Sequence, residues 1–214
     1  MDLLRTVCKT IITLIKKVRQ SKSYKTLEIG FKTTLGIPVR YRSPARTILE
    51  NSILPYFSTQ SAGSKVLFVG CDWYTKHYNK DYFRHAEYWT IDPDTAKKRY
   101  GAKYHVSSKL ELLDQHFRPE YFDVIICNGV LGYGLNNTRQ AEQAFNCCYT
   151  CLQPSGKLVI GREDDRHFIP FSNEELKSLR QFHPYFLPPL ATSKYRIGSG
   201  YNYSFNFYEK PPNF

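Results

Sequence analysis

The residues of this sequence that could do chemistry lie in short loops that follow apolar stretches. One such stretch, residues 66–69, runs into Gly70, Cys71 and Asp72. A glycine after a buried strand lets the backbone approach a ligand, and a following helix offers free N–H groups to an anion. Asp92 ends the next apolar stretch, at roughly the twenty-residue distance from the glycine at which an acid accepts hydrogen bonds from ribose hydroxyls. Together the two loops predict a site for a nucleoside-containing ligand.

Asp92 also has a simpler interpretation as the N-cap of the helix that follows it. Asp94 fits that cap better, because Thr95 and Ala96 come directly after it. We therefore assign the cap to Asp94 and the ribose to Asp92.

Two further loops extend the predicted site. Ser107 follows the third apolar stretch, where it could face an adenine or cap the next helix, and capping is the commoner role. The fourth stretch leads into Asn128 and Gly129, with more glycines at 132 and 134. So much flexible backbone at the end of a buried strand is hard to explain by packing alone and indicates a ligand-binding loop.

The charged run at 163–167 offers candidates for proton transfer. Asp164 and His167 are the predicted general bases, although most runs of this kind are solvated loops. Cys148 and Cys151 have the spacing of half a zinc site, but they fall within a helical pattern with no second ligand pair, so we predict core thiols and no metal site.

Strands and helices must alternate along the chain to position these loops. Continuous apolar strands separated by helices indicate a parallel sheet with both faces covered, and ligands of such sheets bind beyond the carboxyl ends of the strands. Alternating aromatic residues at 201–207 predict a late antiparallel strand. The predicted strands are 65–69, 87–91, 103–106, 121–126 and 157–160, and the predicted helices are 76–84, 94–100, 108–116 and 138–152.

Positive charge is concentrated before this alternating region. Residues 1–46 carry eleven Lys/Arg and two acids, a net charge of +9, out of +11 for all 214 residues. Residues 1–20 have helical period with one apolar stripe and a basic opposite face. This pattern fits a helix at an anionic membrane surface as well as it fits a helix that covers the sheet or the acceptor pocket. Nucleic acid is a less favoured partner, because the positive and negative charges of the remaining chain nearly balance.

The chain is predicted to have two parts: a basic helical N-terminal extension, residues 1–61, and a domain at 62–214. In the extension, 21–43 is interpreted as turn-rich, and a second helix is expected from Pro44 to near Pro55. No run of about 18 apolar residues could span a bilayer, and Lys9 interrupts the short apolar stretch at the N-terminus. With six cysteines interpreted as free thiols, we expect a cytoplasmic protein that touches a membrane only peripherally, through residues 1–20.

Four stretches in order, "KVLFVGCD", "WTIDPD", "FDVIICNGVLGYG" and "CLQPSGKLVIG", resemble the first, second, fourth and fifth motifs of class I S-adenosylmethionine-dependent methyltransferases. The resemblance implies an α/β fold: a three-layer Rossmann-like sheet of seven strands, mostly parallel, with an antiparallel C-terminal strand. It also implies that Gly70 lines the methionine part of S-adenosylmethionine, Asp92 the ribose, Ser107 the adenine and Asn128 the sulfonium. The complete implied cofactor-binding set is Gly70, Cys71, Asp72, Asp92, Ser107, Asn128 and Gly129.

The chain departs from the family's usual pattern at two positions of the first loop. Phe68 stands where relatives usually have an acid, and Asp72 where they usually have a glycine. There is also no Asn-Pro-Pro-Tyr type sequence after the fourth strand, which counts against planar nitrogens as acceptors. Trp73, Tyr74 and Tyr133 are the residues predicted to wall an acceptor pocket.

The function implied by the resemblance is transfer of a methyl group from S-adenosylmethionine to a small or medium acceptor. One alternative is a non-catalytic methyltransferase-like adaptor whose basic arm binds a membrane or nucleic acid. A second is a nicotinamide-dependent oxidoreductase, which is disfavoured because the three-glycine fingerprint that approaches a pyrophosphate is absent.

Overall fold

The computed structural model describes residues 22–213 except 36, 38, 61, 166 and 199. Contacts divide the chain into two units, Met1–Arg40 and Tyr41–Phe214. Residues 44–59, which we grouped with the N-terminal extension, therefore belong to the same unit as the sheet.

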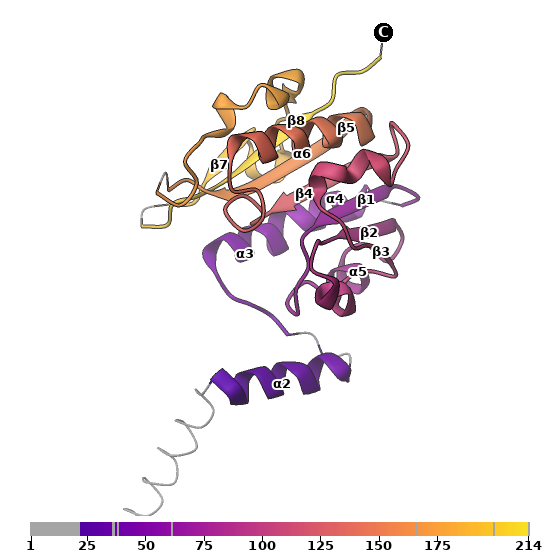
Figure 1. Ribbon diagram of the computed structural model, residues 1–214, viewed down its shortest axis with the longest axis vertical. Coiled ribbons are helices and arrows are strands. Elements are labelled where there is room, and N and C mark those ends of the chain that lie inside the picture. The colour runs from indigo at the N-terminus through magenta and orange to yellow at the C-terminus, as the bar shows by residue number, and fades with distance from the viewer. Residues whose placement is uncertain are drawn as a thin grey trace, which may run out of the picture. The chain divides into compact units, whose positions relative to one another are not determined.

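A mostly parallel sheet forms the centre of the second unit (Figure 1). Its strand order is β3-β2-β1-β4-β5-β8-β6, with β7 paired to β8. Strands β1 to β5 are parallel, and β8 is antiparallel to β5, as predicted for the aromatic tail. The strands in the described residues are β1 (Lys65–Val69), β2 (Glu87–Ile91), β3 (Tyr104–Val106), β4 (Phe122–Asn128), β5 (Leu152–Glu163), β6 (His183–Pro184), β7 (Lys194–Arg196) and β8 (Tyr203–Glu209).

Helices cover both faces of this sheet and so complete three layers. In β1, Leu67 and Val69 pack into one core cluster while Val66 and Phe68 pack into the other, because successive side chains of a strand point to opposite faces. The first cluster is closed by α6 (Thr138–Cys151), which lies against the sheet in Figure 1. The helical segment 44–59 closes the second. The α/β, Rossmann-like fold is thus confirmed, although the sheet in the described residues has eight strands where the resemblance implied seven.

The helix that begins at Pro44 does not stop near Pro55 as predicted. It runs through α3 (Pro44–Ile48), a π-helical turn η1 (Leu49–Ile53) and α4 (Leu54–Thr59). Proline breaks a regular helix because it lacks the N–H that bonds four residues back. Here the proline falls in the first turn of α4, directly after the wider π-helical turn, where that bond is not needed.

Residues 21–43 are also not turn-rich throughout, since α2 spans Lys22–Thr34. Glu28 and Lys32 form an i,i+4 ion pair at 2.5 Å that supports this helix, a local stabilisation that an apolar pattern does not reveal. The helix predicted over residues 1–20 lies outside the described residues. Within the described part of the chain, no helix is long and apolar enough to cross a bilayer.

Three of the predicted helices between strands are shorter than expected, whereas α6 agrees with its prediction. The first is only α5 (Tyr78–Asp81), and the next two are 3₁₀ turns, η2 (Thr95–Tyr100) and η3 (Leu110–Gln115). The Asp94 side chain caps η2 by accepting from the Ala96 N–H at 2.9 Å, as predicted. Because these connections are short, side chains rather than helix ends hold the loops at the carboxyl edge of the sheet in place.

Candidate functional site

A cavity of about 770 Å³ lies at the carboxyl ends of β1, β2 and β4. Strand order reverses between β1 and β4, so the cavity occupies the topological switch point at which α/β sheets bind ligands. Its volume is in the range of sites for cofactors and drug-sized ligands. Its lining includes Tyr41, Ser43, Arg46, Phe68, Gly70–Asp72, Tyr74, Asp92–Asp94, Lys97, Ser108–Glu111, Asn128–Val130, Tyr133, Glu163, Tyr201 and Tyr203.

Gly70 and Gly129 turn the chain out of the two strands that flank the switch point. Their φ angles are +78° and +68°, in the left-handed region that side-chain-bearing residues rarely adopt. The Gly70 N–H bonds Ile91 O at 2.8 Å, and the Gly129 N–H bonds Gly161 O at 2.9 Å. Each turn is therefore pinned to the neighbouring strand, and both predicted glycines line the cavity.

Asp92 joins the first two loops. Its carboxylate is buried; Oδ2 accepts from the Cys71 N–H and Oδ1 from the Asp94 N–H, both at 2.9 Å. A carboxylate has about four acceptor positions, so each oxygen keeps one for a ligand. Because Asp92 also lines the cavity, it is placed to accept hydrogen bonds from vicinal hydroxyls there.

Asp72, which stands where the resemblance implied a glycine, closes the first loop on itself. Its Oδ1 accepts from the Trp73 N–H at 2.7 Å, and its Oδ2 lies 3.2 Å from Lys97 Nζ. The Thr75 hydroxyl accepts from the Asp72 N–H at 3.0 Å, and the Thr75 N–H donates to Asp72 O at 2.9 Å. Residues 72–75 thus form a turn that is closed by side chains, and the helix after this loop, α5, begins only at Tyr78, outside the cavity lining.

Cys71 contributes its backbone to the site rather than a reactive thiol. Burial, followed by the charge of Asp92, raises the pKa of this thiol to about 12. Its Sγ contacts Lys97 O at 3.6 Å. A protonated thiol is a poor nucleophile, so covalent chemistry at this position is not expected.

Asn128 lies at the end of β4 and lines the cavity. Its Oδ1 accepts from the Tyr203 hydroxyl at 3.0 Å, which connects β4 to the antiparallel β8. The opposite residue on β5 is Gly161, and a Cβ there would collide with Asn128 Oδ1. The glycine therefore makes room for the asparagine.

Three predicted site residues lie elsewhere. Ser107 is exposed and does not line the cavity, whereas its neighbour Ser108 does. His167 is exposed, and its backbone N–H bonds Asp165 Oδ1 at 2.8 Å. Asp164 turns toward Ser204, whose hydroxyl donates to it at 2.9 Å. The geometry thus gives neither predicted base a place in the cavity.

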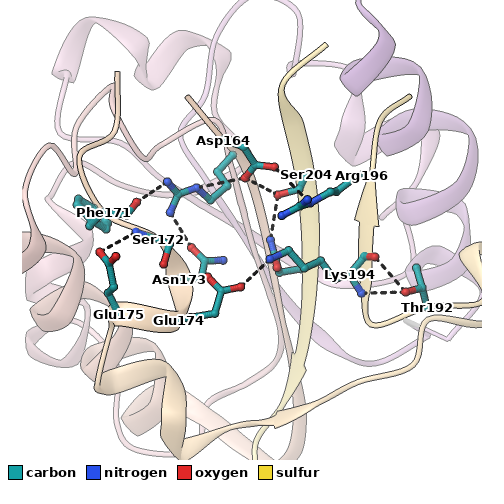
Figure 2. A network of polar contacts seen from close by, with 12 residues as sticks. Asp164, Phe171, Ser172, Asn173, Glu174, Glu175, Thr192, Lys194, Arg196 and Ser204 are labelled. Atoms are coloured by element: carbon teal, nitrogen blue, oxygen red, sulfur yellow. Dashed lines mark hydrogen bonds and ion pairs between the residues drawn. The ribbon is translucent and has the colours of Figure 1, made fainter. Parts of the chain in front are cut away.

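Asp164 belongs instead to a polar network around Arg162, shown in Figure 2. The buried Arg162 guanidinium donates to Asn173 Oδ1 at 2.9 Å and to Phe171 O at 2.6 Å. Beside it, an ion pair of 2.6 Å with Lys194 lowers the pKa of Glu174 to about 2. The charges here are paired with one another, so the network holds β5 to the 171–175 segment and to β7.

Glu163 is the member of the 163–167 run that lines the cavity. Burial, together with the negative charges of Asp165 and Asp164, raises the pKa of its carboxyl above the usual range. A carboxylate with a raised pKa accepts a proton more readily near neutral pH. Glu163 is the last residue of β5. The predicted strand ended at residue 160, and a strand that continued to 163 would have placed Glu163 at the carboxyl edge of the sheet.

The sequence motifs also missed the contribution of the segment at 41–46. Tyr41, Ser43 and Arg46 line the cavity although they precede the first strand by about twenty residues. The Arg46 guanidinium lies 4.5 Å from the centre of the Tyr74 ring. No local pattern marks these residues, because only the packing of segment 44–59 on the sheet brings them there. Among the described residues, no group of three or more His, Cys, Asp or Glu could hold a metal ion.

A family model described as a methyltransferase domain matches residues 67–160. No curated protein matches the sequence.

Solved structures with a similar fold include the N-methyltransferase NodS from Bradyrhizobium japonicum WM9, with 17% identity over 79% of this chain and 98% of that one, and a TM-score of 0.59. The 1,6-didemethyltoxoflavin-N1-methyltransferase from Burkholderia thailandensis, solved with 1,6-didemethyltoxoflavin and S-adenosylhomocysteine, has 17% identity over 79% of each chain and a TM-score of 0.54. A SAM-dependent methyltransferase from Archaeoglobus fulgidus has 15% identity over 78% of this chain and 92% of its own, also with a TM-score of 0.54. At such identities the likeness shows the fold.

Proposed function

We propose that this chain, which carries a class I S-adenosylmethionine-dependent methyltransferase domain, transfers the methyl group of S-adenosylmethionine to a small or medium acceptor in the cavity at the switch point. The observation that carries the proposal is Asp92, buried at the end of β2 and tied to the loop after β1, with acceptor positions left for ribose hydroxyls. The match to the methyltransferase model supports the same reading.

The residues that line the cavity suit this cofactor. Asp92 would bind the ribose, the backbone at Ser108–Leu110 would face the adenine, and Asn128 and Gly129 would lie near the sulfur. The methionine end could lie close to the backbone at Gly70, which has no side chain. The atom nearest to the position that a Cβ would take there is Val130 Cγ1, 3.5 Å away. The cofactor would supply a methyl group already activated by a positive sulfur.

The protein's own task is then to hold the acceptor in line and to exclude water. Aromatic side chains surround that part of the cavity, namely Tyr74, Tyr133, Tyr201 and Tyr203. Where the acceptor enters as a hydroxyl or an ammonium, Glu163 would take its proton. The family model and the three solved structures named above are of methyltransferases, and they give the adaptor alternative no support.

The test is the thermal stability of the intact chain with S-adenosylmethionine, S-adenosylhomocysteine or NAD. A ligand at a hundred times its Kd stabilises a protein by about 2.7 kcal/mol, which raises the Tm of a chain this long by roughly 5–10 °C. We expect such a rise with the first two ligands and none with NAD. A rise with NAD alone would point to the oxidoreductase alternative, and no rise with any of them would contradict cofactor binding.

We also propose that the basic segment attaches the protein to an anionic membrane surface. Leu27 and Phe31, one helical turn apart on α2, are 72% and 67% exposed. They stand within a segment, residues 1–46, whose net charge is +9. Apolar side chains flanked by lysines are typical of helices that lie at the lipid interface.

We expect the intact chain to co-sediment with vesicles that contain phosphatidylserine and to be released by salt, since each basic residue contributes about 1 kcal/mol near such a surface. Removing residues 1–20 should abolish this binding and leave cofactor binding intact. Exchanging Leu27 and Phe31 for serine should weaken it. Co-sedimentation that survives the truncation would refute the proposal, and a lower Tm without vesicle binding in either form would show a packing role instead.

A further inference from the structure

Arg46 is held firmly at the wall of the cavity. Its Nη1 donates to the Tyr78 hydroxyl at 2.5 Å, and that hydroxyl in turn donates to Glu50 Oε1 at 2.9 Å. The guanidinium also lies over the Tyr74 ring. These contacts fix the cation in one position before any ligand arrives.

The charge of Arg46 has no direct counter-ion. Among the described residues, no carboxylate oxygen lies within 4.0 Å of its guanidinium, and Glu50 is reached only through Tyr78. Burial raises the pKa values of Tyr74 and Tyr78, so both phenols stay neutral. An arginine has five N–H donors, and a half-buried one with most of them unused is suited to an anion in the adjoining cavity.

The backbone donors directly after β1 are already used within the protein. The N–H groups of residues 70–73 are all occupied within the protein: Gly70 by Ile91 O, Cys71 by Asp92, Asp72 by Thr75 and Trp73 by the Asp72 side chain. The helix that follows this loop, α5, starts only at Tyr78, so its N-terminus is not part of the cavity lining. A ligand carboxylate near Gly70 therefore finds no free N–H group at residues 70–73.

Arg46 stands at the end of the cavity away from the predicted adenine position. The ribose and adenine residues follow β2 and β3, whereas Arg46 contacts Tyr74 after β1. Its positive charge also reaches Tyr203 of β8, where it opposes the rise in pKa that burial causes. A cofactor with its ribose on Asp92 would extend its amino-acid end toward this side.

We propose that Arg46 binds the carboxylate of the methionine moiety of S-adenosylmethionine, an assignment that rests on the proposed function. The other source of a carboxylate is the methyl acceptor. Arg46 would then be a specificity-determining residue that separates the full cofactor from adenosine thioethers lacking the amino-acid group.

The experiment compares two ligands by titration calorimetry. S-adenosylhomocysteine carries the carboxylate, and 5′-methylthioadenosine keeps the adenosine and sulfur without it. For Arg46→Met we expect S-adenosylhomocysteine to bind at least about tenfold more weakly, the effect of losing a charge-assisted hydrogen bond. The affinity of this variant for 5′-methylthioadenosine should stay within about twofold of the wild-type affinity, because this ligand has no carboxylate for Arg46 to bind. Arg46→Lys, which keeps the charge, should fall between.

Arg99 supplies the matched control, because its guanidinium also stacks on a tyrosine, 4.8 Å from the Tyr100 ring centre, but does not line the cavity. Arg99→Met should change neither affinity. Equal weakening of both ligands by Arg46→Met would mean that Arg46 only supports the wall, and unchanged affinity for both would assign it to the acceptor; either result overturns the inference. If wild type binds neither ligand, it is the proposed function that fails.

Discussion

Replacing Asp92 with alanine is expected to weaken S-adenosylhomocysteine binding by about ten- to hundredfold. The loss of a charged hydrogen-bond partner costs about 1.5–3 kcal/mol, and every 1.4 kcal/mol is a factor of ten in Kd. Asp92 has a second role that adds to this loss, because it holds the Cys71 and Asp94 N–H groups and thus the shape of two loops. Titration calorimetry measures the change directly.

The control for this prediction is Asp72→Ala, an acid that lines the same cavity. The Asp72 carboxylate already binds Lys97 and the Trp73 N–H of its own turn. Its loss should therefore weaken ligand binding less than the loss of Asp92. Both variants should remain folded by circular dichroism. If Asp72→Ala weakens binding more than Asp92→Ala does, the assignment of the ribose to Asp92 is wrong.

Replacing Gly161 with alanine is expected to damage both the fold and the site. The new Cβ would overlap Asn128 Oδ1 and come within 2.7 Å of Phe205 Cε1, a fully buried ring. Overpacking of this kind costs about 1–3 kcal/mol, which lowers the Tm of a chain this long by roughly 2–12 °C. Because the displaced Asn128 lines the cavity, cofactor affinity should fall as well.

Gly198→Ala provides the comparison, since no atom lies within 4 Å of a Cβ at that exposed position. Its Tm should be unchanged or slightly higher, as an alanine restricts the unfolded chain. A Gly161→Ala protein as stable as wild type, with unchanged affinity for S-adenosylhomocysteine, would show that β5 can shift to accommodate the methyl group.

The sheet could be predicted from the sequence because its strands are continuous apolar runs, as in residues 66–69, and because the aromatic alternation before Glu209 marks a strand of a different kind. The helices were less predictable. Apolar spacing does not distinguish an α-helix from the short 3₁₀ turns at 95–100 and 110–115. It also could not foresee that a π-helical turn would carry the chain past Pro55.

The part of the site that could be predicted comes from the loops after β1, β2 and β4, where strand ends fix the geometry. Gly70, Asp92 and Asn128 all line one cavity. The remainder depends on contacts between distant segments. Arg46 reaches the cavity only because its helix packs on the sheet, and Glu163 does so only because β5 continues past residue 160.

The position of β8 has a consequence for synthesis of the chain. β8 pairs with β5, β6 and β7, yet about forty residues separate the end of β5 from its start. At ribosomal rates of 5–20 residues per second, β5 therefore waits roughly 2–8 s for its partner. During that interval Leu158, Val159 and Ile160 present an unpaired, apolar strand edge, the kind of edge on which nascent chains aggregate. A chaperone that shields this edge would protect the newly made protein until Tyr203–Glu209 arrives to close the sheet.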